Sequence, residues 1–272
     1  MAPVSAATSL PCGDGQDAAR PAASCTATLG DMHDAAPRPP QDYPWPEALP
    51  PLAVLGAGGA AEPAADLPAA DAALARLGAA GLEGRHLVLA VGSNRNPQVI
   101  AAKYAHAGLL QDAQAATVLV TAHVTGIAVG HSAHASAPGY VPAAPFAAPG
   151  ARTEVTGLWV TTEQREAIDV TEPNYERLAL PVGPFPLELA AGEAPAAAEV
   201  YASRHGVIGR LRPLPLHASQ QELFDRLAAL VDPDPFEGDA AEVCARLAAD
   251  PEDARALLAS HGLDLPDGLP RP

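Results

Sequence analysis

Residues 87–94, LVLAVGSN, followed by Arg95-Asn96-Pro97, decide how this chain folds. The apolar run before Gly92 has the length of a buried strand, and it ends abruptly at Gly92-Ser93-Asn94. Asn96 is a preferred N-cap residue, and Pro97 suits the first helical position, where its missing N–H costs nothing. A strand that turns on glycine into a helix start points several backbone N–H groups at one spot, which favours an anion. The sequence therefore predicts a strand, a binding loop and a helix, with a carboxylate or phosphate bound by the loop.

The composition limits the class of partner. The 272 residues carry a net charge of −16, and Lys103 is the only lysine. Nucleic acids and anionic membrane surfaces require a basic patch, which no run of Lys and Arg supplies, so we expect neither as a partner. No stretch approaches the roughly 20 apolar residues of a membrane span. The first residues also lack the basic start and apolar centre of a signal peptide, and we therefore expect a cytoplasmic protein.

Neither a metal nor a cofactor is predicted. The cysteines are odd in number, and their spacing gives neither a disulfide framework nor a zinc site. One of them falls on the apolar side of a predicted helix and is expected to pack there. Three histidines could ligate a metal, but no acidic or cysteine partner stands near them and a closed site needs about four ligands. These residues are Cys12, Cys25, Cys244, His123, His131 and His134.

Two further motifs lack the context that their chemistry requires. Residues 56–61, GAGGAA, match the dinucleotide-binding pattern GxGxxA, but Pro63 and Pro68 would interrupt the helix that must follow, so a flexible loop is expected. Residues 130–134, GHSAH, resemble a nucleophile elbow, but His134 replaces the glycine that allows the close strand-to-helix approach.

The composition also divides the chain into four regions. Residues 1–50 form a Pro- and Ala-rich acidic arm that cannot bury enough apolar surface to fold, and we expect it to be disordered. Residues 51–85 form a docking segment or linker, residues 86–215 the main domain, and residues 216–272 a helical extension. Within 42–55, Tyr43 and Trp45 are framed by prolines, which suggests an extended segment that docks on the core.

The secondary structure of the main domain is predicted to be mixed. β-Branched residues and turn signals predict strands at 86–91, 117–129, 140–146, 154–160, 175–182 and 199–203, with a turn at 148–150. Capping residues and apolar spacing predict helices at 71–82, 97–106, 161–172, 219–231, 239–250 and 250–262. Because most links between strands are short, these elements predict an α+β fold with a small, mixed, barrel-like sheet and flanking helices.

Glu172 is the candidate for acid–base chemistry. It lies where a helix ends and directly before Pro173, which fixes the exit of the chain. The alternative is a solvated carboxylate with no function at the C-terminal end of the helix. The helix dipole makes a negative charge at this end unfavourable by some tenths of a kcal/mol. An acid kept in such a place is worth considering as a general base.

Taken in order, these residues resemble the γ-glutamylcyclotransferase-like superfamily. The resemblance covers roughly residues 86–205. Its members share a strand that ends in a YGSN-type loop, a turn with proline and glycine before a V-x-G-x-V/L-W strand, and a helix that ends in L-D-x-x-E with a tyrosine shortly after. The corresponding residues here are Val91-Gly92-Ser93-Asn94, Gly139 to Val141, Pro149-Gly150, Val155 to Trp159, Ile168-Asp169-Val170-Thr171-Glu172 and Tyr175, followed by Tyr201 on a late strand.

This resemblance implies an enzyme of the transferase or lyase type that releases 5-oxoproline from a γ-glutamyl amine or peptide. Glu172 would be the acid/base, and the substrate-binding residues would be Val91, Gly92, Ser93, Asn94, Tyr140, Tyr175 and Tyr201. The implied partner is a small molecule with a γ-glutamyl-like group, with no cofactor.

The chain also departs from the family pattern. Val91 stands where the family usually has tyrosine, and the link from Glu172 to Tyr175 is short. The alternative is therefore a catalytically inactive protein of the same fold that binds a small metabolite or a protein partner. The two alternatives differ in the place of Glu172, which an enzyme would bury beside the Gly-Ser-Asn loop and an inactive protein could leave in solvent.

Overall fold

The computed structural model describes residues 38–45, 48–231 and 235–271. The strands are β1 (Leu52–Leu55), β2 (Ala61–Pro63), β3 (His86–Ala90), β4 (Thr117–His131), β5 (Ala143–Val160), β6 (Tyr175–Pro181), β7 (Leu187–Leu189), β8 (Ala197–Ser203), β9 (Val207–Ile208) and β10 (Asp264–Leu265). The helices are α1 (Leu67–Arg76), α2 (Pro97–His106), α3 (Asp112–Ala115), α4 (Thr162–Val170), α5 (Gln220–Ala228), α6 (Ala240–Ala249) and α7 (Pro251–Ser260), with 3-10 turns η2 (Pro40–Asp42) and η3 (Ser93–Arg95). Of the arm predicted to be disordered, residues 1–50, the structure describes 38–45 and 48–50, where residues 40–42 form a turn and Tyr43 is buried, so this part is ordered. The rest of the arm, with Cys12 and Cys25, lies outside the described residues.

The predicted mixture of helices and strands is confirmed, and most of the strands form one large mixed sheet. Its strand order is β2-β1-β4-β5-β3-β8-β6, and β7 also pairs with β4. The β3–β8 pair is parallel, whereas the other pairs in this sheet are antiparallel. In the described residues no ladder joins β6 to β7, so the sheet is not closed into a barrel.

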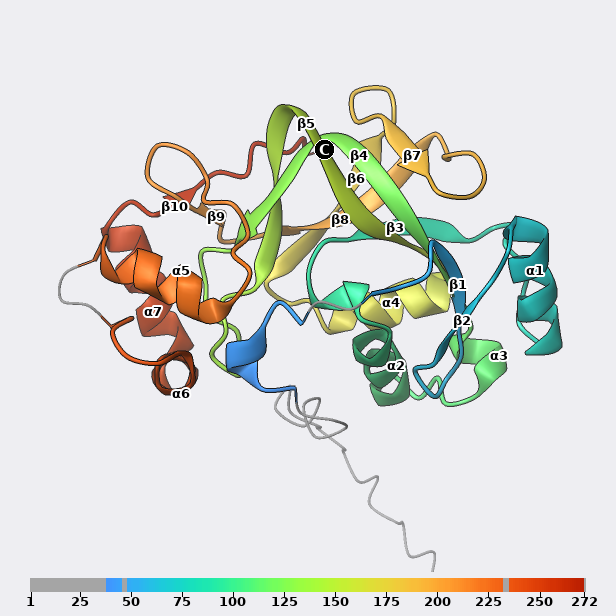
Figure 1. Ribbon diagram of the computed structural model, residues 1–272, viewed down its shortest axis with the longest axis horizontal. Coiled ribbons are helices and arrows are strands. Elements are labelled where there is room, and N and C mark those ends of the chain that lie inside the picture. The colour runs from blue at the N-terminus through green and yellow to red at the C-terminus, as the bar shows by residue number, and fades with distance from the viewer. Residues whose placement is uncertain (1–37, 46–47, 232–234, 272) are drawn as a thin grey trace, which may run out of the picture.

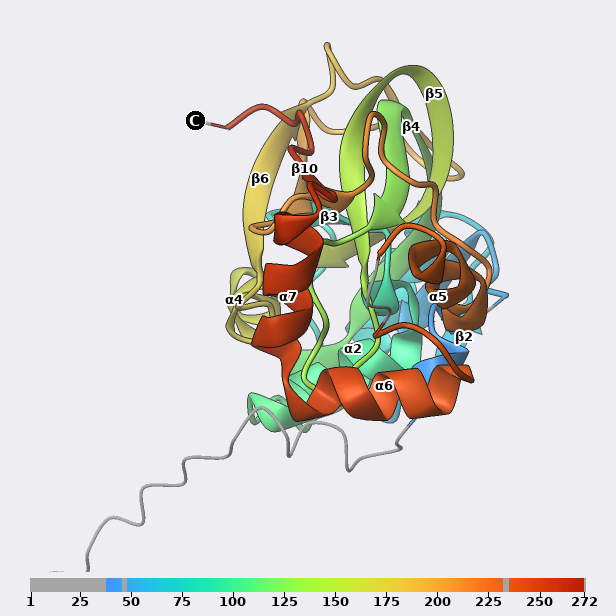
Figure 2. The same ribbon diagram turned by 90° about the vertical axis from the view of Figure 1, so that its left-hand side faces the viewer.

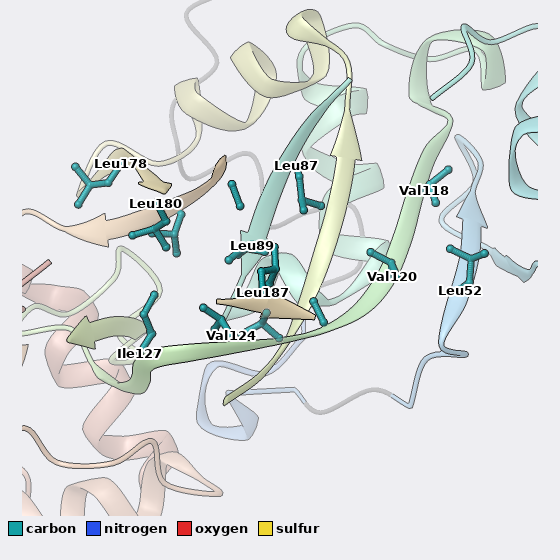
Figure 3. Packing of buried hydrophobic residues seen from close by; sticks show 14 of the residues in the cluster. Leu52, Leu87, Leu89, Val118, Val120, Val124, Ile127, Leu178, Leu180 and Leu187 are labelled. Atoms are coloured by element: carbon teal, nitrogen blue, oxygen red, sulfur yellow. The ribbon is translucent and has the colours of Figure 1, made fainter. Parts of the chain in front are cut away.

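Side chains alternate between the two faces of the central strand β3, as a strand requires. Leu87 and Leu89 belong to a core on one face, together with residues of β1, β4, β6, β7 and α1 (Figure 3). Val88 and Ala90 belong to a second core on the opposite face, which α2 and α4 cover. The strand is therefore buried on both sides, and its end delivers the Gly-Ser-Asn loop to a fixed place.

Most predicted helices are confirmed, with their caps. The Asn96 side chain caps α2, Thr161 and Gln164 form the capping box of α4, and Ser219, Asp239 and Asp250 cap the last three helices. The helix predicted over 71–82 lies instead at Leu67–Arg76, because Asp66 supplies the N-cap and Pro68 is tolerated in the first turn.

Two predictions about strands are wrong. The strands expected at 140–146 and 154–160 are one long strand, β5, and residues 148–151 bulge opposite Gly126 on β4 rather than forming a turn between separate strands. The sheet also begins before residue 86, because β1 pairs with β4 and forms a hairpin with β2. Residues 56–60, which hold most of the GxGxxA pattern, are the connection of that hairpin and do not lead from a strand into a helix.

The three C-terminal helices gather at one end of the molecule, away from α1 (Figures 1 and 2). Their buried residues form a third core with residues of the 133–141 loop. Cys244 is buried there in α6, as the sequence predicted, and burial raises the pKa of its thiol to about 12. No described helix has the length and apolar character needed to cross a membrane.

We expect the packing of the 133–141 loop against α6 to contribute strongly to the free energy of unfolding. Gly139 has φ +91°, and a Cβ there would lie 1.8 Å from the Cys244 carbonyl oxygen. Gly139→Ala should therefore lower the free energy of unfolding by at least about 3 kcal/mol, measured by urea denaturation. Gly150→Ala is the matched control, because its φ is +82° and nothing lies within 4 Å. It should cost only about 1 kcal/mol, and equal losses in the two variants would contradict the contact.

Candidate functional site

A cavity of about 640 Å³ opens where β3 ends. Segments far apart in the sequence line it, including the first described residues, the loop after β3, helix α2, the 134–143 loop and the turn after α4. All the residues that the sequence singled out line this cavity, namely Val91, Gly92, Ser93, Asn94, Tyr140, Glu172, Tyr175 and Tyr201. The structure thus brings the predicted site residues together.

Glu172 is nearly buried and carries an ion pair. Its Oε1 lies 2.5 Å from the Nζ of Lys103, and the two side chains are 13% and 8% exposed. The Asn94 Nδ2 donates a second hydrogen bond, of 2.9 Å, to the same oxygen. Both contacts involve Oε1, and neither Lys103 nor Asn94 uses Oε2. The carboxylate lies beside the Gly-Ser-Asn loop, where an enzyme would need it.

The side chain of Asn94 has one polar atom without a hydrogen-bond partner in the described residues. It is 9% exposed, and its Oδ1 is buried without a hydrogen-bond partner in the described residues. A buried acceptor left unpaired costs about 1–3 kcal/mol. A ligand that presents an N–H group near Glu172 could satisfy this oxygen.

At the start of α2 several backbone N–H groups are already bonded within the protein, while the anion site predicted for the loop before it stays a prediction. The Asn96 side chain accepts hydrogen bonds from the N–H groups of Gln98 and Val99, at 3.0 and 3.3 Å. The N–H groups of Arg95 and Asn96 bond to carbonyls within the turn that precedes the helix. The cap therefore occupies two donors of the first helical turn. The side chains of Lys103 and Arg38 also bring positive charge to the lining of the cavity.

Two tyrosines that line the cavity use their hydroxyl groups in hydrogen bonds within the protein. Tyr175 donates to the Ala143 carbonyl at 2.9 Å, and Tyr201 donates to Asp169 at 2.7 Å. Burial, followed by neighbouring charges that include Glu172, raises the pKa of Tyr140 and Tyr175. These rings are therefore neutral walls of the cavity at physiological pH.

Asp169 holds the turn that carries Glu172. It receives two hydrogen bonds from Arg177, at 2.9 and 3.2 Å, besides the one from Tyr201. Arg177 and Arg165 both pair with Glu199 on β8. This network joins the end of α4 to strands β6 and β8, so the position of Glu172 is fixed from outside the cavity.

Tyr43 and Trp45 pack on the core, as the sequence predicted. Tyr43 is 1% exposed, and its hydroxyl oxygen accepts a hydrogen bond of 2.8 Å from the Ala143 N–H. Its ring stacks on Tyr140, with centroids 4.6 Å apart. A Cβ on Gly92 would lie 2.8 Å from the Tyr43 hydroxyl, so the glycine of the loop lets this tyrosine approach.

The histidines form pairs with other polar side chains. His131 lies 3.1 Å from His217, and His134 lies 2.6 Å from the Ser132 hydroxyl. In the described ranges, no three His, Cys, Asp or Glu side chains form a group that could hold a metal ion. Burial, and then its neighbours His205 and Arg255, lower the pKa of His134 to about 3.

Sequence reasoning did not place Lys103, Arg38 or Tyr43 in the site, and it considered His134, which also lines the cavity, only as a metal ligand and as part of the 130–134 motif. The signal for Lys103 was present, because it is the only lysine and lies on a helix that starts directly after the loop. Tyr43 and Trp45 were recognised as docking residues, but nothing in the sequence placed them at the cavity, about 50 residues before the loop.

Against family models, curated proteins and solved structures, this chain has no match. Its function is therefore inferred from the residues of the site.

We expect the Lys103–Glu172 pair to be coupled. Lys103→Met should lower the free energy of unfolding by about 2–4 kcal/mol, because it leaves the nearly buried Glu172 carboxyl group without its ion-pair partner. Adding Glu172→Gln should recover most of this loss, as a double-mutant cycle followed by urea denaturation would measure. The control is Arg152→Met, which removes an exposed pair of 2.8 Å and should cost less than about 1 kcal/mol. Additive single losses would show that the pair is not coupled.

The buried His134 should make the fold sensitive to acid. Its pKa is about 3 when folded and about 6.5 when unfolded. Its contribution is present above about pH 6.5 and is lost as the pH falls toward 3, by about 1.4 kcal/mol per pH unit. The free energy of unfolding is measured by urea denaturation at pH 6 and at pH 5. The decrease from pH 6 to pH 5 should be about 1 kcal/mol smaller in His134→Gln than in the parent protein. The exposed His106 is the control, and His106→Gln should leave the pH dependence unchanged. An unchanged slope in His134→Gln would contradict the assignment.

Proposed function

We propose that this chain is a γ-glutamylcyclotransferase-like enzyme that converts a γ-glutamyl amide into 5-oxoproline and a free amine. The observation that supports this proposal most directly is the place of Glu172. It lines the cavity, is nearly buried and lies beside the Gly-Ser-Asn loop. An inactive binding protein has no need for a carboxylate held in this way.

In the proposed reaction the α-amino nitrogen of the substrate attacks its own γ-carbonyl carbon. The new C–N bond closes the five-membered ring, and the amide bond to the amine breaks. Glu172 takes the proton that the attacking nitrogen loses and delivers it to the leaving amine, through the oxygen that Lys103 and Asn94 do not contact. Such proton transfer contributes about 10²- to 10⁴-fold to the rate. Since both reacting groups belong to one bound molecule, positioning supplies much of the remainder.

The other residues of the cavity fit this reaction. The guanidinium of Arg38 favours the glutamyl carboxylate, and the Asn94 Oδ1, which has no partner in the described residues, offers an acceptor to the reacting amine. Val91 lacks the ring that the family usually has at this position, but Tyr43 brings its hydroxyl to the adjacent Gly92 from a distant segment. We include the family's barrel-like sheet in this proposal, because β7 follows β6 closely in the chain while it pairs with β4.

The test is 5-oxoproline release from a panel of γ-glutamyl amides and γ-glutamyl amino acids. Glu172→Gln should lower the release rate at least about 100-fold, because an amide cannot shuttle the proton. The control is Glu176→Gln, which changes an acid on β6 that pairs with Arg271 and does not line the cavity. The control should retain the parent rate. No release by folded parent protein with any member of the panel would favour the alternative, a binding protein of the same fold.

A further inference from the structure

The cavity is larger than a glutamyl group requires. Its volume of about 640 Å³ is within the range of about 300–1,000 Å³ that encloses drug-sized ligands. Asn94 and Lys103 contact Glu172 at the place proposed for the glutamyl part. The aromatic residues Tyr43, Trp45 and Tyr140 also line the cavity and remain for the other part of the substrate, its amine.

These three rings pack on one another and form a continuous wall. Tyr43 stacks on Tyr140, and Trp45 meets both in edge-to-face contacts with centroids 5.1 Å apart. A cage for a cation would need a space between rings, and these distances leave none. The wall presents the outer surface of a ring to the cavity, and another flat apolar group can stack on that surface.

Trp45 is held in this wall at a cost. Its φ is +52°, in the left-handed region that a bulky residue rarely adopts. Its backbone N–H bonds to the Asp42 carbonyl at 3.2 Å, and its indole N–H bonds to the Pro39 carbonyl at 3.1 Å. Strain of this kind persists only where the surroundings fix it, and it concentrates at functional sites. The half-buried indole of Trp45 is therefore held in a fixed position by these contacts.

The charges of the cavity argue against a cationic amine. Lys103 and Glu172, which both line it, form an ion pair, and Arg38 adds a further positive charge to the lining. Among the described residues the lining therefore carries more positive than negative charge, which repels a positively charged leaving group but not a neutral ring.

We propose that the wall formed by Tyr43, Trp45 and Tyr140 binds the amine part of the substrate, and that the preferred substrates carry a neutral aromatic ring there. This inference rests on the proposed function. It adds the chemical class of the amine and makes Trp45 a residue that determines specificity.

The experiment compares two amides that differ only in one ring, γ-glutamyl-phenethylamide and γ-glutamyl-ethylamide. The parent protein should show a kcat/KM at least about 10-fold higher for the phenethylamide, since the ring is buried and stacked. Trp45→Ala should remove most of this preference, while Trp45→Phe should retain part of it. The control is Trp159→Phe, which changes a tryptophan on β5 outside the cavity and should preserve the preference.

A binding measurement separates this inference from the proposed function. The variant Trp159→Phe with Glu172→Gln leaves Trp45 as the only tryptophan, because the chain has two. Its tryptophan fluorescence should change saturably as the phenethylamide is added. The affinity for the ethylamide, measured in the same way, should be at least about 10-fold weaker. This result without 5-oxoproline release by the parent protein would overturn the proposed function and keep the aromatic subsite. Turnover of both amides with equal kcat/KM would overturn the subsite and keep the proposed function. If Trp45→Ala does not fold, the parent preference and Trp45→Phe decide the question.

Discussion

The buried ion pair between Lys103 and Glu172 joins two elements that are 69 residues apart. One partner comes from helix α2 and the other from the turn after α4, and both helices pack on the same face of the sheet. Burying two charges is costly unless they meet in good geometry with further hydrogen bonds. The second bond here comes from Asn94, at the end of β3. Strand, loop and both helices must therefore be in place before the pair can form, and the site is assembled only in the finished fold.

A second constraint fixes the opposite wall of the cavity. Ala143, where β5 begins, gives its N–H to Tyr43 and its carbonyl to Tyr175. One peptide position thus ties the first described segment and the strand after Glu172 to the long β4–β5 ribbon. The aromatic wall is built on this anchor, which explains how a segment with little structure of its own, a single 3-10 turn, can contribute a ring with a strained backbone to the site.

Local signals in the sequence predicted the helices well, because their caps lie within four residues and act on the nearby backbone. The capping box of Thr161 and Gln164 is one example. The ordered motif from Gly92 to Tyr201 also predicted which residues line one cavity. What could not be predicted depends on long-range pairing. The bulge opposite Gly126 requires knowledge of the partner strand, and the burial of Lys103 requires knowledge of which side of α2 faces Glu172.

The choice of lysine at position 103 is itself informative. Fifteen of the sixteen basic residues are arginines, so arginine would be the expected cation for any ion pair in this chain. Around the end of α4, Arg177 grips both oxygens of Asp169, as its planar fork allows. The same grip on Glu172 would occupy both carboxylate oxygens and leave none to exchange a proton. An ammonium is a compact charge that needs only one of them. The single lysine therefore holds this carboxylate through one oxygen, as the proposed acid–base role of Glu172 requires.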